Sequence, residues 1–234
     1  NPLGVGTLLD AANALTKAAY DRADSGQLAS ALRVLREADF LLQALADPEV
    51  IALRHLQTEV ETVRRARIKQ RAELIRLEAR IAMRRAQYTV ARAAFQQVVE
   101  LYEGLKESAG ASTAETEMAM AILRAGDSTK ALERTASSQA RLGHAGDPVA
   151  RAGNYWAQGQ IRAIRGELAK AYGNANFGLE LIQRAGLADA QPQLRAELHM
   201  LAASILDSAG LSGDAAERMN YAVDLAPTDR NIAR

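Results

Sequence analysis

The sequence predicts an all-α protein, a right-handed solenoid of antiparallel helical hairpins with about ten helices. Three observations carry this prediction. Apolar residues recur with a period near 3.6, as at Met118, Ile122 and Leu123, which is typical of amphipathic helices. A short pattern, a small residue followed five positions later by Ala, recurs along the chain. Aromatic residues make up only 4% of the 234 residues, which disfavours an architecture of many β-strands.

The recurring pattern marks the turns between helices. It occurs at Gly26–Ala31, Ala86–Ala91, Gly126–Ala131, Gly166–Ala171 and Gly210–Ala215, so that the alanines are 60, 40, 40 and 44 residues apart. A small residue in the turn and another one turn into the next helix allow two antiparallel helices to cross closely. We therefore expect helices over 6–24, 27–46, 48–85, 88–108, 112–125, 128–142, 148–165, 167–185, 190–209 and 212–226.

Local signals predict where these helices begin and end. An N-cap residue before Pro, or Ser followed three residues later by Glu, indicates a helix start. These signals stand at Asp47-Pro48, Asp147-Pro148 and Ser112–Glu115, and Ser212 precedes the last helix. Helix stops are expected at Gly110, Gly143 and Gly186.

The segment 48–85 is unusually long for one helix. It contains no Gly and, beyond Pro48, no Pro, and a continuous helix there would be about 57 Å long. We therefore expect a break near 65–68 that separates an extra helix over 48–66 from the repeats, with one continuous helix as the alternative. The repeats are then expected at 6–46, 67–108, 112–143, 148–186 and 190–227, within one domain over 1–234.

The residues around these turns resemble the tetratricopeptide repeat (TPR), which has a small residue in its first helix, Gly at the turn, then Ala, a large apolar residue and Ala, with Pro near the end. The last repeat matches at Ala203, Gly210, Ala215, Met219, Ala222 and Pro227. Earlier repeats match at Ala19, Gly26, Ala31, Leu35 and Ala38; at Ala79, Tyr88, Ala91 and Phe95; at Ala119, Gly126 and Ala131; and at Gly159, Gly166 and Ala171. The resemblance covers nearly the whole chain.

Most of the repeats are about 40 residues long, whereas the usual TPR has about 34 residues. In this they are similar to repeats of the maltose-regulon activator class of bacterial transcription regulators, and to those of kinesin light chains. The resemblance implies a non-catalytic module that binds a protein, a peptide or a small effector, as the sensor or scaffold arm of a bacterial transcriptional or signalling regulator. The chain begins with Asn1 rather than Met, and its last helix ends with apolar side chains. We therefore expect a fragment of a larger protein that contacts a missing domain or a second copy of itself.

Several classes of function find no support in the sequence. There is no Cys, and the three His residues (His55, His144 and His199) are too widely spaced for a metal-ligand motif. No phosphate-binding loop or nucleophile elbow occurs, so we expect no catalytic residue, no metal, no cofactor and no enzymatic activity. His199 is expected to be a packing residue. No apolar stretch is as long as the roughly 18 residues that a membrane-spanning helix needs, and a cytoplasmic location without a membrane contact is expected.

In a TPR solenoid the first helix of each hairpin lines a concave groove. Projected onto the repeats, the predicted groove residues are Tyr20, Arg76, Arg80, Arg84, Met120, Arg124, Trp156, Gln160 and Met200. The three arginines of the second repeat form an i, i+4, i+8 stripe, which either binds a carboxylate, phosphate or acidic peptide or is balanced by acids on neighbouring helices. Trp156, the single Trp, is either a hot spot for a peptide or apolar ligand or a packing residue between repeats. Its neighbour Tyr155 is expected in the core.

Charge is distributed unevenly along the chain, although the formal net charge is only +1. Residues 54–92 hold eleven basic and four acidic side chains, whereas residues 93–133 hold three and seven. The basic segment supports an alternative hypothesis, a helical-repeat protein that binds nucleic acid. The lack of interleaved aromatic residues and the adjacent acidic segment count against that alternative.

Overall fold

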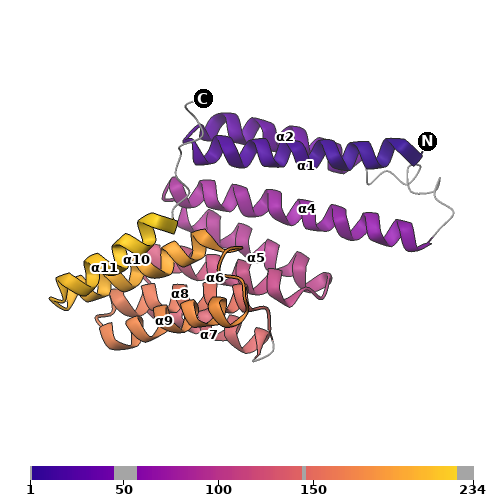
Figure 1. The fold of residues 1–234 in the computed structure, drawn as a ribbon. Coiled ribbons are helices and arrows are strands. Elements are labelled where there is room, and N and C mark those ends of the chain that lie inside the picture. Colours follow the sequence, from indigo (N-terminus) through magenta and orange to yellow (C-terminus); the bar gives the residue numbers. More distant parts are fainter. Residues whose placement is uncertain (1, 45–56, 144–145, 226–234) are drawn as a thin grey trace. The chain divides into compact units, whose positions relative to one another are not determined.

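A computed structural model describes residues 2–44, 57–143 and 146–225, and within these ranges it contains ten α-helices and no strand (Figure 1). The helices are α1 (Pro2–Asp24), α2 (Leu28–Ala44), α4 (Gln57–Arg84), α5 (Tyr88–Gly104), α6 (Ser108–Arg124), α7 (Ser128–Leu142), α8 (Pro148–Ile164), α9 (Leu168–Arg184), α10 (Pro192–Ser208) and α11 (Ser212–Leu225). The prediction of an all-α chain of helical hairpins is confirmed for these residues. Of the sequence signals, Asp47-Pro48, His55 and His144 lie outside them.

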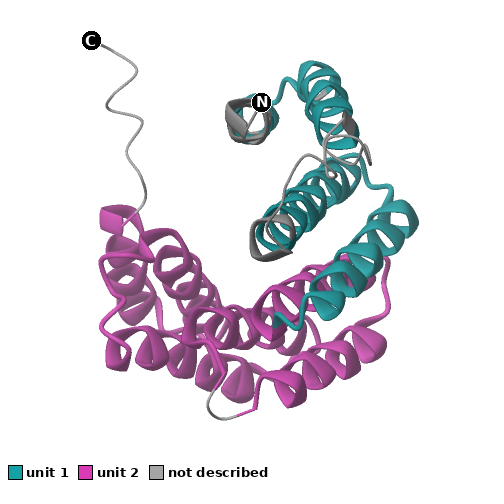
Figure 2. Cartoon of the chain, turned by 90° about the vertical axis from the view of Figure 1, so that its right-hand side faces the viewer, with its two compact units in different colours: residues 1–107 teal, residues 108–234 magenta. Residues whose placement is uncertain are grey.

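Contacts between helices divide the chain into two compact units, 1–107 and 108–234 (Figure 2). The first unit contains the hairpins α1–α2 and α4–α5, and α4 also contacts both helices of the first hairpin. The second unit contains the hairpins α6–α7, α8–α9 and α10–α11, in which α8 packs on α6, α7 and α10. The prediction that the whole chain forms a single repeat domain stays a prediction.

One type of turn recurs between helices. At Gly126, with φ +98°, the amide donates to the carbonyl of Leu123 at 2.9 Å, and the next amide, of Asp127, donates to the carbonyl of Ile122 at 3.2 Å. This is the Schellman arrangement, whose left-handed residue is usually Gly. The Asp127 side chain then caps α7 by accepting from the amide of Lys130 at 2.9 Å. The end of one helix and the start of the next are thus fixed within three residues.

This turn accounts for the spacing of the recurring alanines. Helices α2, α5, α6, α8, α9 and α10 all have the same length, 17 residues. Most of the connections between described helices consist of three residues. A helix with its turn therefore covers half of the usual spacing between the alanines, and a hairpin covers all of it. The Ala that follows each turn is buried, with 0% of its surface exposed at Ala31, Ala91, Ala131 and Ala171. The recurring pattern thus combines a turn with a close helix crossing, as predicted.

The predicted boundary between the second and third hairpins is wrong. Helix α5 ends at Gly104 and α6 begins at Ser108, four residues before the predicted start. The turn between them has Lys106 in the left-handed region (φ +59°), a conformation that the sequence analysis assigned to small residues. Gly110 is consequently no helix stop. The expected capping residues Ser112 and Glu115 lie buried within α6 instead.

The predicted break near 65–68 is also wrong, because α4 continues unbroken from Gln57 to Arg84. Within 57–84 there is no Gly or Pro to interrupt it. The apolar side chains Leu74, Leu77 and Ile81 anchor it in a core formed with α1 and α2. A separate helix over 48–66 is therefore excluded for residues 57–66, and residues 48–56 lie outside the described part of the chain.

The Asp147 N-cap and the stops at Gly143 and Gly186 are confirmed. Asp147 accepts from the amide of Ala150 at 2.8 Å. Gly143 is the C-cap of α7, and Gly186 follows the C-cap of α9. Two other glycines serve close packing: a Cβ atom on Gly159 or Gly178 would lie 2.7 Å from a methyl group of Leu201 or Leu198 of α10. Helix α10 therefore lies closely against both α8 and α9.

Candidate ligand-binding cleft between helices α8 and α10

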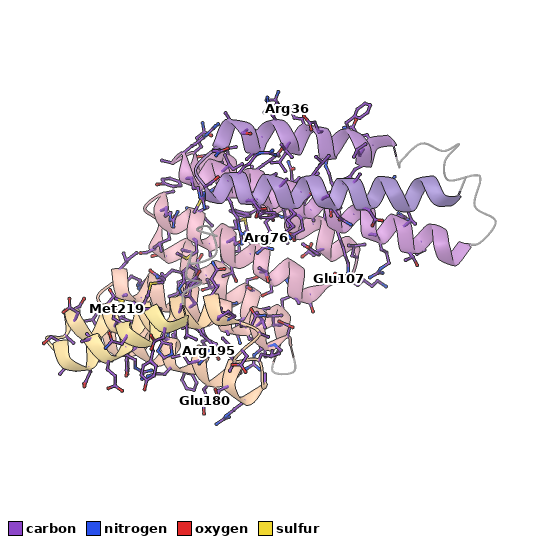
Figure 3. All side chains as sticks on the ribbon, turned by 45° about the horizontal axis from the view of Figure 1, so that its top comes forward. Arg36, Arg76, Glu107, Glu180, Arg195 and Met219 are labelled. Atoms are coloured by element: carbon purple, nitrogen blue, oxygen red, sulfur yellow. The ribbon has the colours of Figure 1, made fainter. Side chains whose placement is uncertain are left out.

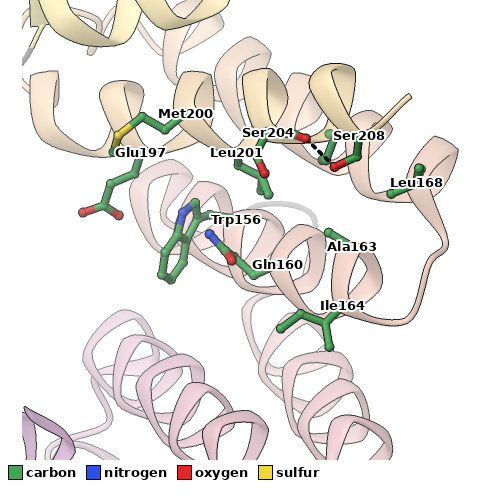
Figure 4. Close-up of a pocket in the computed structure, with 11 residues that line it drawn as sticks. Trp156, Gln160, Ala163, Ile164, Leu168, Glu197, Met200, Leu201, Ser204 and Ser208 are labelled. Atoms are coloured by element: carbon green, nitrogen blue, oxygen red, sulfur yellow. Dashed lines mark hydrogen bonds between the residues drawn. The ribbon is translucent and has the colours of Figure 1, made fainter. Parts of the chain in front are cut away.

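Helices α8 and α10, the first helices of two successive hairpins, border a cleft of about 510 Å³ (Figure 4). Eleven residues line it: Trp156, Gln160, Ala163, Ile164, Leu168, Glu197, Met200, Leu201, Ser204, Ile205 and Ser208. Seven of these side chains are apolar, and one, Glu197, is ionisable. The cleft thus combines apolar side chains with polar groups, as ligand sites do.

The helical period explains which side chains reach the cleft. On α8, Ala157 and Ile161 are fully buried, so the adjacent row Trp156, Gln160 and Ile164 lies beside them along the cleft. Trp156 is half-buried, because part of its ring packs on the core that contains Leu201 and the rest borders the cleft.

On α10 the buried Leu201 and Ile205 form the floor of the cleft, and Glu197, Met200, Ser204 and Ser208 follow one another at helical spacing beside them. The Ser208 hydroxyl donates to the carbonyl of Ser204 at 2.8 Å. Ile164 and Met200 keep 66% and 44% of their surface exposed. Binding of a ligand that removes this apolar surface from water is favourable.

The two ends of the cleft differ in chemistry. Figure 4 shows Trp156, Glu197 and Met200 at one end, and Ile164, Leu168 and Ser208 at the other. The carboxylate of Glu197 accepts a hydrogen bond from Gln193 at 3.4 Å on its own helix, and Glu197 has a further interaction within the chain. The cleft therefore has an anionic end that carries an aromatic face and an end without a charged lining residue.

Three of the nine predicted groove residues lie in this cleft: Trp156, Gln160 and Met200. Met120, expected beside Trp156, is buried in α6 and does not line the cleft, and Arg124 is exposed at the end of α6. Ile164 and Glu197 are among the lining residues that were not predicted. Both follow from the helical period, eight residues after Trp156 and three before Met200.

Tyr155, expected in the core, is half-buried instead. It stacks on the exposed Phe177 of α9, with ring centroids 5.9 Å apart. The helical period explains the correction: Ala157 and Asn154 occupy the buried row of α8, and Tyr155 falls beside it.

The remaining predicted residues lie in the first unit, where Tyr20 and Arg76 belong to a cluster around Glu73. The hydroxyls of Tyr20 and Tyr102 donate to the two carboxylate oxygens of Glu73 at 2.9 and 2.8 Å, and Arg76 lies 3.4 Å from it. Burial, followed by the charge of Glu73, raises the pKa of both tyrosines. Burial acts to raise the pKa of Glu73 as well, but Arg76 and the two hydroxyls together lower it. The cluster joins α1, α4 and α5, and Figure 3 labels Arg76.

The stripe formed by Arg76, Arg80 and Arg84 is engaged by the chain itself. Arg76 pairs with Glu73, and Arg84 donates to the carbonyl of Ala23. Arg80 is exposed and also has an interaction within the chain. These contacts engage the stripe within the chain, through an acid of α4 itself and a carbonyl of α1 rather than through the expected acids on neighbouring helices.

Three other basic residues of α4 also pair with acidic side chains of the chain. Arg65 and Lys69 lie 3.3 and 2.7 Å from the carboxylate of Glu107, and Arg71 pairs with Asp39 of α2. Because these side chains are largely exposed, each pair contributes little to stability. The pairs nevertheless reduce the cationic surface that a phosphate backbone would meet.

His199 supplies a prediction about pH. It is buried and stacks on Tyr221 at 5.4 Å, and burial, followed by Arg218 and Arg195, lowers its pKa from 6.5. Below about pH 6.5 His199 is protonated in the unfolded chain, whereas in the folded chain it stays neutral to a lower pH. The folded chain therefore loses stability as the pH falls from about 6.5. We expect His199→Phe to reduce this loss of stability, measured by urea unfolding at pH 7.5 and 5.5. If the free energy of unfolding falls by the same amount between pH 7.5 and pH 5.5 in the variant and in the wild type, the prediction is wrong.

Two other kinds of feature, a metal site and a membrane-spanning helix, are absent from the described residues. They contain no group of three or more His, Asp or Glu side chains placed to hold a metal ion. No helix among them combines the length and the apolar character needed to cross a membrane.

Comparison with known proteins gives fold similarity alone. No protein-family model matches the sequence, and no curated protein is a match. Among solved structures, BtubC (BKLC) from P. vanneervenii is similar with a TM-score of 0.56 and 12% identity, over 94% of this chain and 89% of that one. A Podospora anserina protein described as a putative kinesin light chain with nearly identical TPR-like repeats is similar with a TM-score of 0.55 and 16% identity, over 91% and 93%. The chain thus has the fold of TPR-like helical-repeat proteins.

Proposed function

We propose that this chain is a non-catalytic interaction module that binds a protein segment in the cleft between α8 and α10. The observation that carries the proposal is the cleft itself, in which the half-buried Trp156 and the exposed Ile164 and Met200 border about 510 Å³. Large aromatic side chains in such positions supply much of the binding energy of interfaces. Gln160 and the serines of α10 add polar groups that orient a bound backbone.

The TPR-like fold supports this proposal, because rigid helical repeats present extended surfaces to partners. We propose further that the chain acts as a sensor or scaffold arm of a bacterial transcriptional or signalling regulator. The support for this narrower role is the length of the repeat, which is similar to that of the repeats in the maltose-regulon activator class.

Binding of nucleic acid through residues 54–92 has less support, because Arg65, Lys69 and Arg71 pair with acids of the chain. That alternative predicts retention on DNA or RNA columns with a steep loss of affinity as salt rises.

Trp156→Ala should weaken the binding of peptides that the wild-type chain selects. A phage library of random heptapeptides is panned against the wild-type chain, and the affinities of synthetic copies of the enriched peptides are measured. We expect Trp156→Ala to weaken these affinities about 30-fold, because truncation of a central aromatic residue costs about 2 kcal/mol or more.

The matched control is Tyr155→Ala, which removes an aromatic side chain next to Trp156 on the same helix. Tyr155 stacks on Phe177 and does not line the cleft. We expect it to leave the affinities within about twofold of wild type, since non-lining positions of an interface contribute little. If no peptide is enriched, or if both variants weaken binding equally, the proposed function is wrong.

A further inference from the structure

The chemistry of the cleft indicates which kind of segment it accepts, and this inference rests on the proposed function. The lining of α10 extends from Glu197 to Ser208, which is about 16 Å along a helix axis. An extended chain covers that length with about five residues.

The anionic end of the cleft favours a cation. Glu197 is the one ionisable residue among the eleven that line the cleft, and it lies at the same end as Trp156 (Figure 4). An indole face attracts Lys and Arg through its quadrupole, and a carboxylate attracts them through its charge. A cationic side chain placed there interacts with both groups, whereas an acidic side chain is repelled by both.

The opposite end of the cleft favours apolar side chains. Ile164 and Leu168 border it, and the floor is formed by Leu201 and Ile205. Side chains of an extended segment alternate between its two faces, so every second residue of a bound segment would contact this floor.

We propose that the cleft binds an extended segment of about five residues, with Lys or Arg at the end bordered by Trp156 and Glu197 and apolar side chains toward Ile164 and Leu168. An acidic partner for the arginine stripe in α4 was one of the two interpretations at the level of the sequence. None of those arginines lines this cleft, and the charge of its lining is the opposite.

The sequences of the enriched heptapeptides test this proposal. The wild-type chain should enrich peptides with Lys or Arg at one fixed position beside apolar residues. Replacement of that cation by Glu in a synthetic peptide should weaken binding at least tenfold, and replacement by norleucine about fivefold. Both losses should shrink at high salt, as expected for an exposed charge interaction.

Charge reversal in the protein completes the test. Glu197→Lys should remove the preference for Lys and Arg, and Glu197→Gln, which keeps the size of the side chain, should weaken binding of the cationic peptide about fivefold. The matched control is Glu180→Lys on α9, an exposed residue outside the cleft that pairs with Arg184 (Figure 3). It should leave the preference unchanged, and thermal unfolding of each variant checks that the fold is intact.

The outcomes separate this inference from the proposed function. Enriched peptides that depend on Trp156 but carry no excess of Lys or Arg would overturn the inference and leave the proposed function standing. A cation preference that survives Glu197→Lys would also overturn it. If no peptide depends on Trp156, both are wrong.

Discussion

Ala171→Leu is expected to lower the free energy of unfolding of the second unit by about 3 kcal/mol, at the upper end of the cost of overfilling a packed core. Ala171 is fully buried where α9 crosses α8, and it packs in a cluster with Leu201 and Ile205. Its carbonyl lies 3.3 Å from the position that a Cβ atom on Gly159 would occupy. Because no space remains between these helices, three additional carbon atoms must push the hairpin apart. Urea unfolding followed by circular dichroism measures the loss.

Ala169→Leu is the matched control, because it makes the same substitution two residues earlier in α9, at a more exposed position. We expect a change within about 0.5 kcal/mol, as for most surface substitutions. Equal destabilisation by the two variants would show that burial at the helix crossing is not what the recurring Ala provides.

Arg141→Met is expected to destabilise the second unit by about 3 kcal/mol, at the lower end of the usual cost of breaking a buried ion pair. Glu115 of α6 is only 1% exposed, and Arg141 of α7 holds both of its carboxylate oxygens at 3.2 Å. Arg134 contacts the same carboxylate at 3.4 Å through a single nitrogen atom. Removal of Arg141 therefore leaves a buried carboxylate with one long contact to a cation.

A double-mutant cycle separates the loss of the ion pair from the loss of packing. Arg134→Met should cost clearly less than Arg141→Met, because the bidentate pair remains. The double variant Glu115→Met with Arg141→Met should recover much of the stability, since the buried carboxylate is removed and Arg134, which also loses its contact, has a side chain that is 39% exposed. If the double variant is no more stable than Arg141→Met alone, the buried charge is not the cause of the destabilisation.

The fold was predictable because its main signals are local. A turn with a small residue and a buried Ala five positions later mark each hairpin, and both depend on backbone geometry within a few residues. The start of α6 was missed because Lys106 occupies the left-handed position that Gly takes elsewhere. The break predicted in α4 was wrong because the usual limit on helix length was applied to a segment that packs on the same core on both sides of residues 65–68, through Val63 and through Leu74.

The candidate site was predictable only in part. Trp156, Gln160 and Met200 come together because each lies on the first helix of a hairpin, which the repeat pattern identifies. The cluster around Glu73 could not be predicted in this way. Glu73 meets Tyr20 and Tyr102 from two other helices, and such contacts between distant segments leave no periodic signal in the sequence.

Fluorescence of Trp156 tests the central claim, that a protein segment binds in the cleft between α8 and α10, most directly. The chain contains one Trp, so both the emission and its quenching by acrylamide report on this site alone. Titration with the tightest heptapeptide from the library should give a saturable blue shift and a decrease in quenching, at the concentrations where polarisation of a labelled copy shows binding. Saturation of the polarisation signal while emission and quenching of Trp156 remain constant would place the binding site elsewhere and contradict the claim.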